Sequence, residues 1–491
     1  MNNRPNILII MSDQHAPNAM GCAGDPVIRT PNLDRLAGQG MRFTNAYCPC
    51  PLCVPSRMSF MSGRYPSRNE VWTNNAMLAS SIPTWPHVLG LAGYETALIG
   101  RMHFLGPDQR HGFMERPIGE GTARHPGAPE LGGPRYTRFP MSTAGQKRAS
   151  FEYAGRGTSF YQHYDTDVTG FACRFLRKHA ERKQPFAAVT GFILPHPPYI
   201  GPKALFDYYS ERVPATPHEG GEPAYVQQMQ KSRSLIPPAT EHQLRVARAA
   251  YYAMVEFMDG NIGRILETLD ETGLAENTLL VYCSDHGDMM GDHGLWSKKS
   301  FYEQAVGIPL IARLPGVAEP GSLCDSLCSL VDMAPTFGEL AGAPEMDADG
   351  ESLVPLLKGQ ANPDRVVLSE LAEMNGGPRF ESVGRMVRYG PWKLWQHQTV
   401  DGTVFPPALF NLKDDPREHR NLAAAPDHVD ILARMQAHLD DGWNPEWVVD
   451  TVRQQTRDWT VLRRWGRATQ PALPDTYTWP GKEIEAGVEL L

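Results

Sequence analysis

The sequence predicts an α/β fold in which a largely parallel sheet is covered by helices on both faces. Short runs that are apolar at nearly every position recur through roughly the first two thirds of the 491 residues, as is typical of strands buried on both faces. Helical patterns lie between these runs, and alternation of strands with helices indicates a parallel sheet. The predicted strands are 6–12, 96–102, 186–194, 278–284 and 307–313.

Two of the intervening helices carry clear end signals. One begins after Thr30, with a proline at its first position, and Gly40 closes it. A longer helix begins at Thr240, which forms a capping box with Gln243, and its apolar face continues toward Gly273. Helices of this kind can cover the faces of the predicted sheet.

The pattern changes near residue 366, where short antiparallel strands and one helix follow. The segments that indicate them are strands 383–389, 392–397 and 408–412 and a helix over 427–440. We therefore expect an α/β domain over 1–365, an antiparallel-sheet-plus-helix subdomain over 366–445 and a C-terminal extension over 446–491. Half of the ten tryptophans lie in the last part of the chain: Trp443, Trp447, Trp459, Trp465 and Trp479. Aromatic side chains at that density need a surface to cover, either on their own chain or on a partner subunit.

Composition narrows the class of protein. An apolar content of 41% with 21% charged residues is that of a globular chain, not of a disordered or fibrous one. A net charge of −8 argues against a nucleic-acid partner. The first apolar run is too short for a signal peptide, and no run approaches the ~20 apolar residues that span a membrane. The sequence thus predicts a cytoplasmic protein without a membrane or nucleic-acid partner.

Two predicted strands end in similar polar pairs. Asp13 and Gln14 follow the first strand, and Asp285 and His286 follow the strand over 278–284. Ligands in such sheets bind beyond the carboxyl ends of the strands. Oxygen-rich groups of this kind favour a hard divalent cation. The alternative is that these residues are ordinary loop or capping residues.

A third feature is a short helix that begins at Cys53 and ends at Gly63. The free amides at a helix N-terminus favour negative charge on Cys53 or on its ligand. Arg57 lies one helical turn away, where its guanidinium can approach an anion held at residue 53. Three other interpretations stay open: a metal knuckle formed with Cys48 and Cys50, simple burial of the cysteines in the core, or an ordinary cysteine nucleophile.

These segments resemble the type I sulfatases of the alkaline phosphatase superfamily. The signature is Cys53-Val54-Pro55-Ser56-Arg57 followed by Met61-Ser62-Gly63-Arg64. The resemblance implies an alkaline-phosphatase-like α/β/α sandwich with a large mixed, mostly parallel sheet and a smaller C-terminal α+β subdomain. The other matching phrases are Asp13-Gln14, Thr30-Pro31-Asn32-Leu33-Asp34, Gly100-Arg101-Met102-His103-Phe104, Pro195-His196-Pro197-Pro198, Ser284-Asp285-His286-Gly287-Asp288, Gly294-Leu295-Trp296-Ser297-Lys298, Leu409-Phe410-Asn411-Leu412 and Asp415-Pro416-Arg417-Glu418.

The resemblance also implies a catalytic machinery. Cys53 would be oxidised after translation to formylglycine, whose hydrated gem-diol is the nucleophile in that family. Residue 53 would complete the ligands of one divalent ion, Ca²⁺ or Mn²⁺. The remaining implied ligands are Asp13, Gln14, Asp285 and His286. The Asp-Gln and Asp-His pairs are most similar to the choline sulfatase and phosphonate monoester hydrolase branch.

Further residues receive roles from the same resemblance. Arg57 would stabilise the nucleophile and the sulfate oxygens, and His103 would be the general base. His196 and Lys298 would help the leaving group depart, with the neighbouring Lys299 as the competing lysine. The residues implied to contact sulfate are Asn75 and Arg101. Arg101 departs from the family pattern, in which lysine usually stands two positions before the histidine.

The expected reaction is hydrolysis of small sulfate esters. The candidate substrates are aryl sulfates and sulfate esters of choline-like alcohols. Promiscuous hydrolysis of phosphonate monoesters or phosphodiesters is expected as a side activity. The alternatives are phosphonate monoester or phosphodiester hydrolysis as the native task, or a non-catalytic metal- or redox-binding protein that uses the three clustered cysteines. The Gly/Pro-rich segment 116–150 is a candidate loop over the site; its arginines are either solvated charges or selective for an anionic or aryl substrate. The expected partners are the ester substrate, a formylglycine-generating enzyme during maturation, and further copies of this chain in a homodimer or homotetramer formed through the C-terminal extension.

Overall fold

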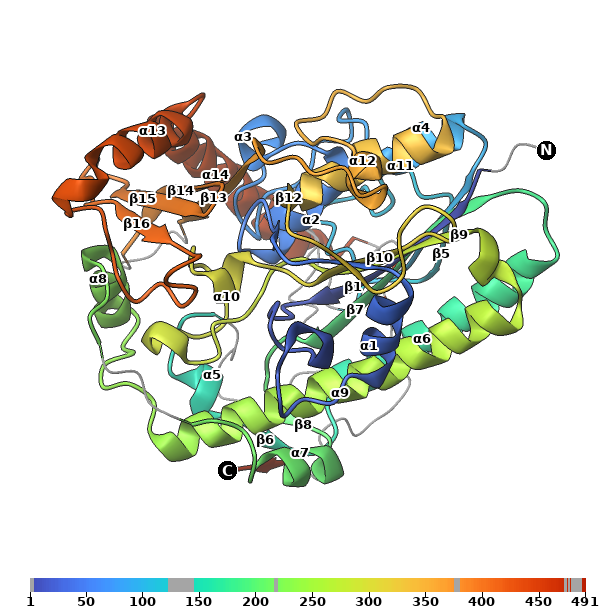
Figure 1. Cartoon of the computed structure of the whole chain (residues 1–491), viewed down its shortest axis with the longest axis horizontal. Coiled ribbons are helices and arrows are strands. Elements are labelled where there is room, and N and C mark those ends of the chain that lie inside the picture. Colours follow the sequence, from blue (N-terminus) through green and yellow to red (C-terminus); the bar gives the residue numbers. More distant parts are fainter. Residues whose placement is uncertain are drawn as a thin grey trace.

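The computed structural model shows an α/β/α sandwich with a smaller antiparallel sheet beside it (Figure 1). This confirms the predicted fold class. The residues that the structure describes are 4–121, 145–215, 220–374, 380–471, 475, 477 and 488–491.

A mixed, mostly parallel sheet of eight strands forms the centre of the described part, in the order β11-β2-β10-β9-β1-β7-β4-β5. Strand β1 lies between β7 and β9 and is parallel to both. Their near-continuous apolar sequence suits this position, because helices cover both faces of the sheet. The strands are β1 (Asn6–Asp13), β2 (Met41–Phe43), β4 (Glu95–Gly100), β5 (Glu115–Ile118), β7 (Phe186–Pro195), β9 (Thr278–Ser284), β10 (Leu310–Arg313) and β11 (Ser322–Cys324).

The predicted strands are confirmed at β1, β4, β7 and β9, but the parallel direction expected of the fifth is wrong. Strand β10 runs antiparallel to both β9 and β2. The chain between β9 and β10 contains only the one-turn helix α10 (Glu303–Val306) and a short 3-10 turn. Without a long crossover helix, the chain re-enters the sheet at the edge where β9 ended, which makes the pairing antiparallel.

Two groups of helices cover the sheet (Figure 1). On one face lie α1 (Pro31–Gln39), α6 (Phe160–Ala180) and α9 (Glu241–Glu271). On the other lie α2 (Cys53–Ser62), α4 (Trp85–Leu91), α11 (Met333–Ala341) and α12 (Val354–Leu357). Both helix-start predictions are confirmed, since Thr30 and Thr240 precede α1 and α9, and Thr240 forms the expected capping box.

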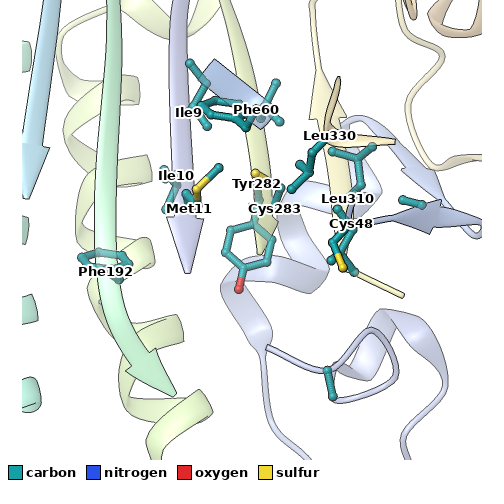
Figure 2. Close-up of a cluster of buried hydrophobic side chains, with 14 of the residues drawn as sticks. Ile9, Ile10, Met11, Cys48, Phe60, Phe192, Tyr282, Cys283, Leu310 and Leu330 are labelled. Carbon is teal, nitrogen blue, oxygen red and sulfur yellow. The ribbon is translucent and has the colours of Figure 1, made fainter. Parts of the chain in front are cut away.

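The core lies between the sheet and these helices. Figure 2 shows Ile9 and Met11 of β1, Tyr282 and Cys283 of β9, and Phe60 of α2 among the buried side chains. Burial at successive positions along β1 and β9 confirms that both faces of these strands are covered. The polar ends of the same strands are therefore fixed by a rigid apolar support.

A four-stranded antiparallel sheet, with the order β13-β14-β15-β16, forms the C-terminal region. Helix α13 (Val429–Asp440) packs Met435 and Leu439 against it. The predicted strands correspond to β14 (Ser382–Tyr389), β15 (Trp392–Thr399) and β16 (Ala408–Asn411) and are confirmed. The strand β13 (Val366–Glu373) was not predicted, because two glutamates interrupt its apolar pattern; both are buried.

The C-terminal extension begins with the long helix α14 (Pro445–Thr469). Its first turns bury Val448 and Val452 against Trp72, and the ring of Trp447 lies 5.0 Å from that of Trp72. Part of the tryptophan-rich segment thus covers its own chain. Trp479 lies outside the described residues.

Beyond α14, the extension returns to the α/β part. Asp475 O accepts a hydrogen bond from Glu120 N, and Tyr477 N donates to Glu120 O, both at 3.1 Å. The final strand β17 (Glu489–Leu490) pairs with β6 (Gly155–Arg156).

No helix among the described residues has the length and apolar character needed to cross a bilayer.

The other elements are short. These remaining elements are β3 (Ala46–Tyr47), α3 (Pro66–Asn69), α5 (Ala149–Glu152), β8 (Ile200–Gly201), α7 (Lys203–Tyr209), α8 (Ala224–Ser232) and β12 (Cys328–Ser329), with 3-10 turns at Gly21–Ala23, Leu274–Asn277, Asp292–Gly294, Leu330–Asp332 and Pro426–His428.

Candidate active site

The ends of β1 and β9 bring the two predicted polar pairs together. The strands are parallel and pair Ser12 with Ser284, so the residues that follow emerge side by side. The Nε2 atom of His286 lies 3.8 Å from Asp13 Oδ1 and 3.6 Å from Asp285 Oδ1. All of these side chains are buried. The expected juxtaposition of carboxylates and imidazole is thus present.

Cys53 joins this cluster as the first residue of α2. Its Sγ lies 3.6 Å from Asp13 Oδ1 and 3.3 Å from His286 Nε2. One ligand atom from each of four residues lies within 4.8 Å of the others, and these residues are Asp13, Cys53, Asp285 and His286. Cys48 and Cys50 are not part of this group and are fully buried.

Local structure fixes the place of Cys53. The extended residue Leu52 precedes α2, and Gly63 ends the helix in the left-handed conformation at φ 68°. Glycine suits this end, since the left-handed region is strained for other residues. Near the start of the helix, Asn74 Oδ1 accepts a hydrogen bond from Val54 N at 3.0 Å and so satisfies one of the free amides.

Arg57 joins the two carboxylates. Its Nε donates to Asp285 Oδ2 at 2.8 Å, and its Nη2 donates to Asp13 Oδ2 at 3.3 Å. The side chain is fully buried, so it has no contact with solvent that would weaken these ion pairs. Each carboxylate therefore has one oxygen on Arg57 and the other near the metal-ligand group.

Positive charge keeps Asp13 ionised. Burial alone would raise the pKa of this carboxyl group, but Arg101, His196, Lys298 and Arg57 together hold the pKa well below its ordinary value. Burial lowers the pKa of His286, which favours the neutral ring that binds metals. His286 Nδ1 donates to Gly287 O at 2.9 Å, leaving the Nε2 lone pair for a ligand.

The remaining predicted ligand, Gln14, also suits a cation. Its Nε2 donates to Asp288 and Ser297, whereas its buried Oε1 has no hydrogen-bond partner. An unpaired buried carbonyl oxygen is costly unless something binds it. With two carboxylates and an imidazole nearby, the donor set fits one divalent ion.

Arg101 lies between three functional groups. Its Nε donates to Asp13 Oδ2 at 2.6 Å, its Nη1 to Glu120 Oε1 at 3.0 Å and its Nη2 to His103 Nδ1 at 2.9 Å. Glu120 also accepts from the backbone N of Met102 and His103, at 3.3 and 2.8 Å. The described contacts of Arg101 thus orient neighbouring residues, and its contact with sulfate stays a prediction.

Lys298 and His196 complete the surroundings of residue 53. The Nζ of Lys298 lies 2.8 Å from Cys53 Sγ, whereas Lys299 pairs with Glu373 at 2.9 Å. This difference favours Lys298 over its neighbour for catalysis. His196 Nδ1 donates to Pro197 O at 2.7 Å. Burial, with a further contribution from Lys298, lowers the pKa of His196.

The structure bears only in part on two further predictions, Asn75 and the loop over 116–150. Asn75 has a backbone hydrogen bond from its N to Thr73 Oγ1, and its contact with sulfate stays a prediction. Most of the predicted loop 116–150 lies outside the described residues, including Arg124, Arg135 and Arg138. Arg116 is buried and donates to Gln109 O at 2.7 Å, so it is not a solvated loop charge.

Glu120, Asn74 and Asp288 support the site but were not predicted, and only Asp288 carries a sequence signal of that role. Glu120 belongs to a Gly-Glu-Gly segment whose local pattern says nothing of its contacts. Asn74 stands directly before Asn75, the asparagine that the family resemblance favours. Asp288 follows the two predicted metal ligands in its segment closely enough that proximity to Asp285 and His286 could have marked it as a supporting residue.

Comparisons with known proteins place this chain among sulfatases. A family model described as Sulfatase matches residues 5–343, and one described as N-sulphoglucosamine sulphohydrolase, C-terminal, matches residues 291–444. Choline-sulfatase of Rhizobium meliloti (strain 1021) is 35% identical over 486 residues, covering 93% of this chain and 91% of that protein. Arylsulfatase K of Danio rerio is 29% identical over 465 residues, covering 89% and 84% of the two chains.

Among solved structures, the phosphonate monoester hydrolase of Agrobacterium radiobacter is similar with a TM-score of 0.69 at 22% identity. The match covers 92% of this chain and 96% of that chain. At this identity, the similarity shows a common fold.

Proposed function

The chain belongs to the sulfatase family of the alkaline phosphatase superfamily and is a sulfuric ester hydrolase, and we propose that it cleaves small sulfate monoesters with a formylglycine at residue 53 and one divalent ion. The observation that carries this proposal is the position of Cys53. Its side chain is buried among Asp13, His286 and Lys298, at the start of a helix. A nucleophile at this position would lie beside both a metal site and cationic groups.

The chain's own residues account for the binding of an anion. Arg57, Arg101 and Lys298 surround the site, and Asp13 and Asp285 balance part of their charge. A fixed arrangement of this kind stabilises charge that develops on the non-bridging oxygens of an ester without reorganising water. The negative net charge of the whole chain does not prevent this, because local charge decides the binding of a small anion.

Formylglycine would supply a hydrated diol as the nucleophile, and the ion would favour its ionised form. Asp13, Gln14, Asp285 and His286 would hold the ion. Lys298 lies close enough to residue 53 to stabilise or protonate a leaving oxygen, and His196 is near enough to both that Lys298 and Cys53 affect its pKa. A correctly placed proton donor contributes about 10²–10⁴-fold to the rate.

The proposed substrates are aryl sulfates and choline-sulfate-like esters. The 35% identical choline-sulfatase supports the latter. Steady-state kcat/KM for p-nitrophenyl sulfate, choline sulfate and a phenyl phosphonate ester would rank the classes. A clearly higher kcat/KM for the phosphonate would make phosphonate ester hydrolysis, the alternative, the native activity.

Mass spectrometry of the tryptic peptide Phe43–Arg57 tests the nucleophile directly. Formylglycine at residue 53 lacks the sulfur atom, whereas Cys48 and Cys50 in the same peptide retain theirs. We expect the modified peptide in protein from the native host, and loss of activity in Cys53→Ala but not in Cys50→Ala. Unmodified Cys53 in fully active protein would contradict the proposal.

Maturation then requires a formylglycine-generating enzyme. Cys53 is only 1% exposed in the folded chain, so its oxidation is best explained before folding is complete. Expression with and without such an enzyme should change the modified fraction of the peptide and the activity in parallel.

We further propose that the C-terminal extension mediates a homodimer or homotetramer. The second half of α14 leaves Val461 66% and Trp465 48% exposed, on a helix whose first half covers its own chain. Apolar side chains of this size on a surface commonly mark an interface. Light scattering should show an oligomer that Trp465→Glu dissociates; a monomeric wild type would contradict this part.

A further inference from the structure

The side-chain amide of Gln14 is fixed in one orientation. Its Nε2 donates to Asp288 Oδ2 at 2.7 Å and to Ser297 Oγ at 2.9 Å. An amide nitrogen has two N–H groups, so these contacts use its full donor capacity. The buried Oε1 is the atom left without a partner.

Asp288 is itself held in place. Tyr199 Oη donates to the same Oδ2 at 2.6 Å, and Met290 N donates to Oδ1 at 3.0 Å. Asp288 and Tyr199 are both buried, with side chains locked by packing and hydrogen bonds. The carboxylate that accepts from Gln14 Nε2 is therefore held in a fixed position.

We propose that Asp288 is a positioning residue that orients Gln14 toward the divalent ion, with Ser297 and Tyr199 as its partners. This inference rests on the proposed metal site. Both oxygens of Asp288 already accept hydrogen bonds, Oδ2 from Tyr199 and Oδ1 from Met290 N, so a reversed Gln14 amide would place its oxygen against an acceptor. The carboxylate thus makes one of the two amide orientations unfavourable and leaves Oε1 available as a ligand.

The same hydrogen bonds connect the metal site to the leaving-group residues. Tyr199 stands three positions after His196, and Ser297 directly precedes Lys298. Gln14, directly and through Asp288, thus shares hydrogen bonds with the segments that carry both residues. Groups that orient metal ligands typically change metal affinity by about 10–100-fold when they are replaced.

The test is metal affinity in the full-length protein, freed of metal and titrated calorimetrically with Mn²⁺ or Ca²⁺ alone. Asp288→Asn keeps the shape but can present an N–H group to Gln14. We expect its Kd to weaken about 10–100-fold, and the rise in Tm on adding the ion to shrink. Neither readout depends on formylglycine or on turnover.

Asp259→Asn is the matched control. Asp259 lies on α9, is buried, and its Oδ2 accepts from the amide Nδ2 of Asn32 at 2.9 Å, outside the candidate site. This variant should lower stability in the metal-free protein without weakening the Kd for the ion. If both variants weakened binding equally, the effect would be general destabilisation and the inference would be wrong.

If Asp288→Asn does not fold, two milder variants provide the same test. Ser297→Ala and Tyr199→Phe each remove one hydrogen bond, and each should weaken the Kd by a smaller factor. An unchanged Kd in both would overturn the inference, as would a wild-type protein that binds neither ion. The wild type could instead bind the ion, and Asp288→Asn bind it more weakly, while the wild type cleaves no sulfate ester. That outcome would contradict only the proposed reaction.

Discussion

Arg101 donates from Nη2 to Nδ1 of His103 over 2.9 Å. Arginine does not release its protons at any pH of interest. The Nδ1 atom is thus the acceptor, and a neutral His103 ring carries its hydrogen on Nε2. A proton taken up by His103 must go to Nδ1 and weaken this contact, so Arg101 bears directly on the general-base role proposed for His103.

Replacing Arg101 should reduce activity more strongly when the new side chain lacks the positive charge. Arg101→Gln removes the charge beside Asp13 and Glu120, and we expect kcat/KM to fall about 10²-fold. Arg101→Lys keeps the charge but offers a single nitrogen, so its activity should lie between those of Arg101→Gln and wild type. Steady-state kinetics with a sulfate ester gives kcat/KM for each variant. A fully active Arg101→Gln would show that Arg101 is not needed for catalysis.

Lys298 and Lys299 form a natural matched pair. Lys298→Ala removes the ammonium group next to residue 53, and kcat should fall at least about 10²-fold, most steeply for poor leaving groups. Lys299→Ala loses only the ion pair with Glu373 and should lower Tm while leaving kcat close to wild type. Kinetics on esters of graded leaving-group pKa distinguishes the two; equal reductions in kcat would contradict the assignment.

Glu120→Gln tests support from the β5 side of the site. The variant leaves Arg101 and the amides of Met102 and His103 with a poorer acceptor, and a misplacement of ~1 Å can cost about 10²-fold in rate. We expect a lower kcat with KM little changed. Glu115→Gln, which weakens the ion pair with Lys178 and leaves the contacts of Arg101 in place, is the control and should retain the wild-type kcat.

His397 should make the protein sensitive to acid. Burial lowers its pKa from the ordinary 6.5 to about 3. Between these values the unfolded chain binds a proton that the folded chain does not, so stability falls as the pH drops through this window. The contribution is about 1.4 kcal/mol per pH unit.

His397→Gln should remove that slope, although the variant lowers stability overall because the ring packs against Tyr225 at 3.6 Å. Urea unfolding at several pH values between about 4 and 7 gives the difference from wild type. The exposed His419, replaced by Gln, is the control and should leave the slope unchanged. A parallel pH dependence in wild type and His397→Gln would show that another group is responsible.

Much of the architecture follows from local sequence. Continuous apolar runs predicted β1, β7 and β9, and their polar ends predicted the group of Asp13, Asp285 and His286. This works because parallel neighbours in register end at one edge of a sheet. The order of residues in the chain is then enough to bring distant carboxylates together.

Other features depend on contacts that no local pattern encodes. The direction of β10 depends on the absence of a crossover helix between it and β9. Glu120 reaches Arg101 only because its segment follows β5, next to β4. The choice between Lys298 and Lys299 depends on the direction of two adjacent side chains, which spacing alone does not determine.

The backbone pairing of Glu120 with Asp475 and Tyr477 has a practical consequence for handling the protein. The far end of the chain holds the same residue whose carboxylate supports Arg101 and His103. Proteolytic trimming of the extension beyond α14 would therefore leave a protein with an intact sheet but a loosened catalytic support. A circular dichroism spectrum would not detect this loss, so the intact mass of a preparation is the better check that the active site is complete.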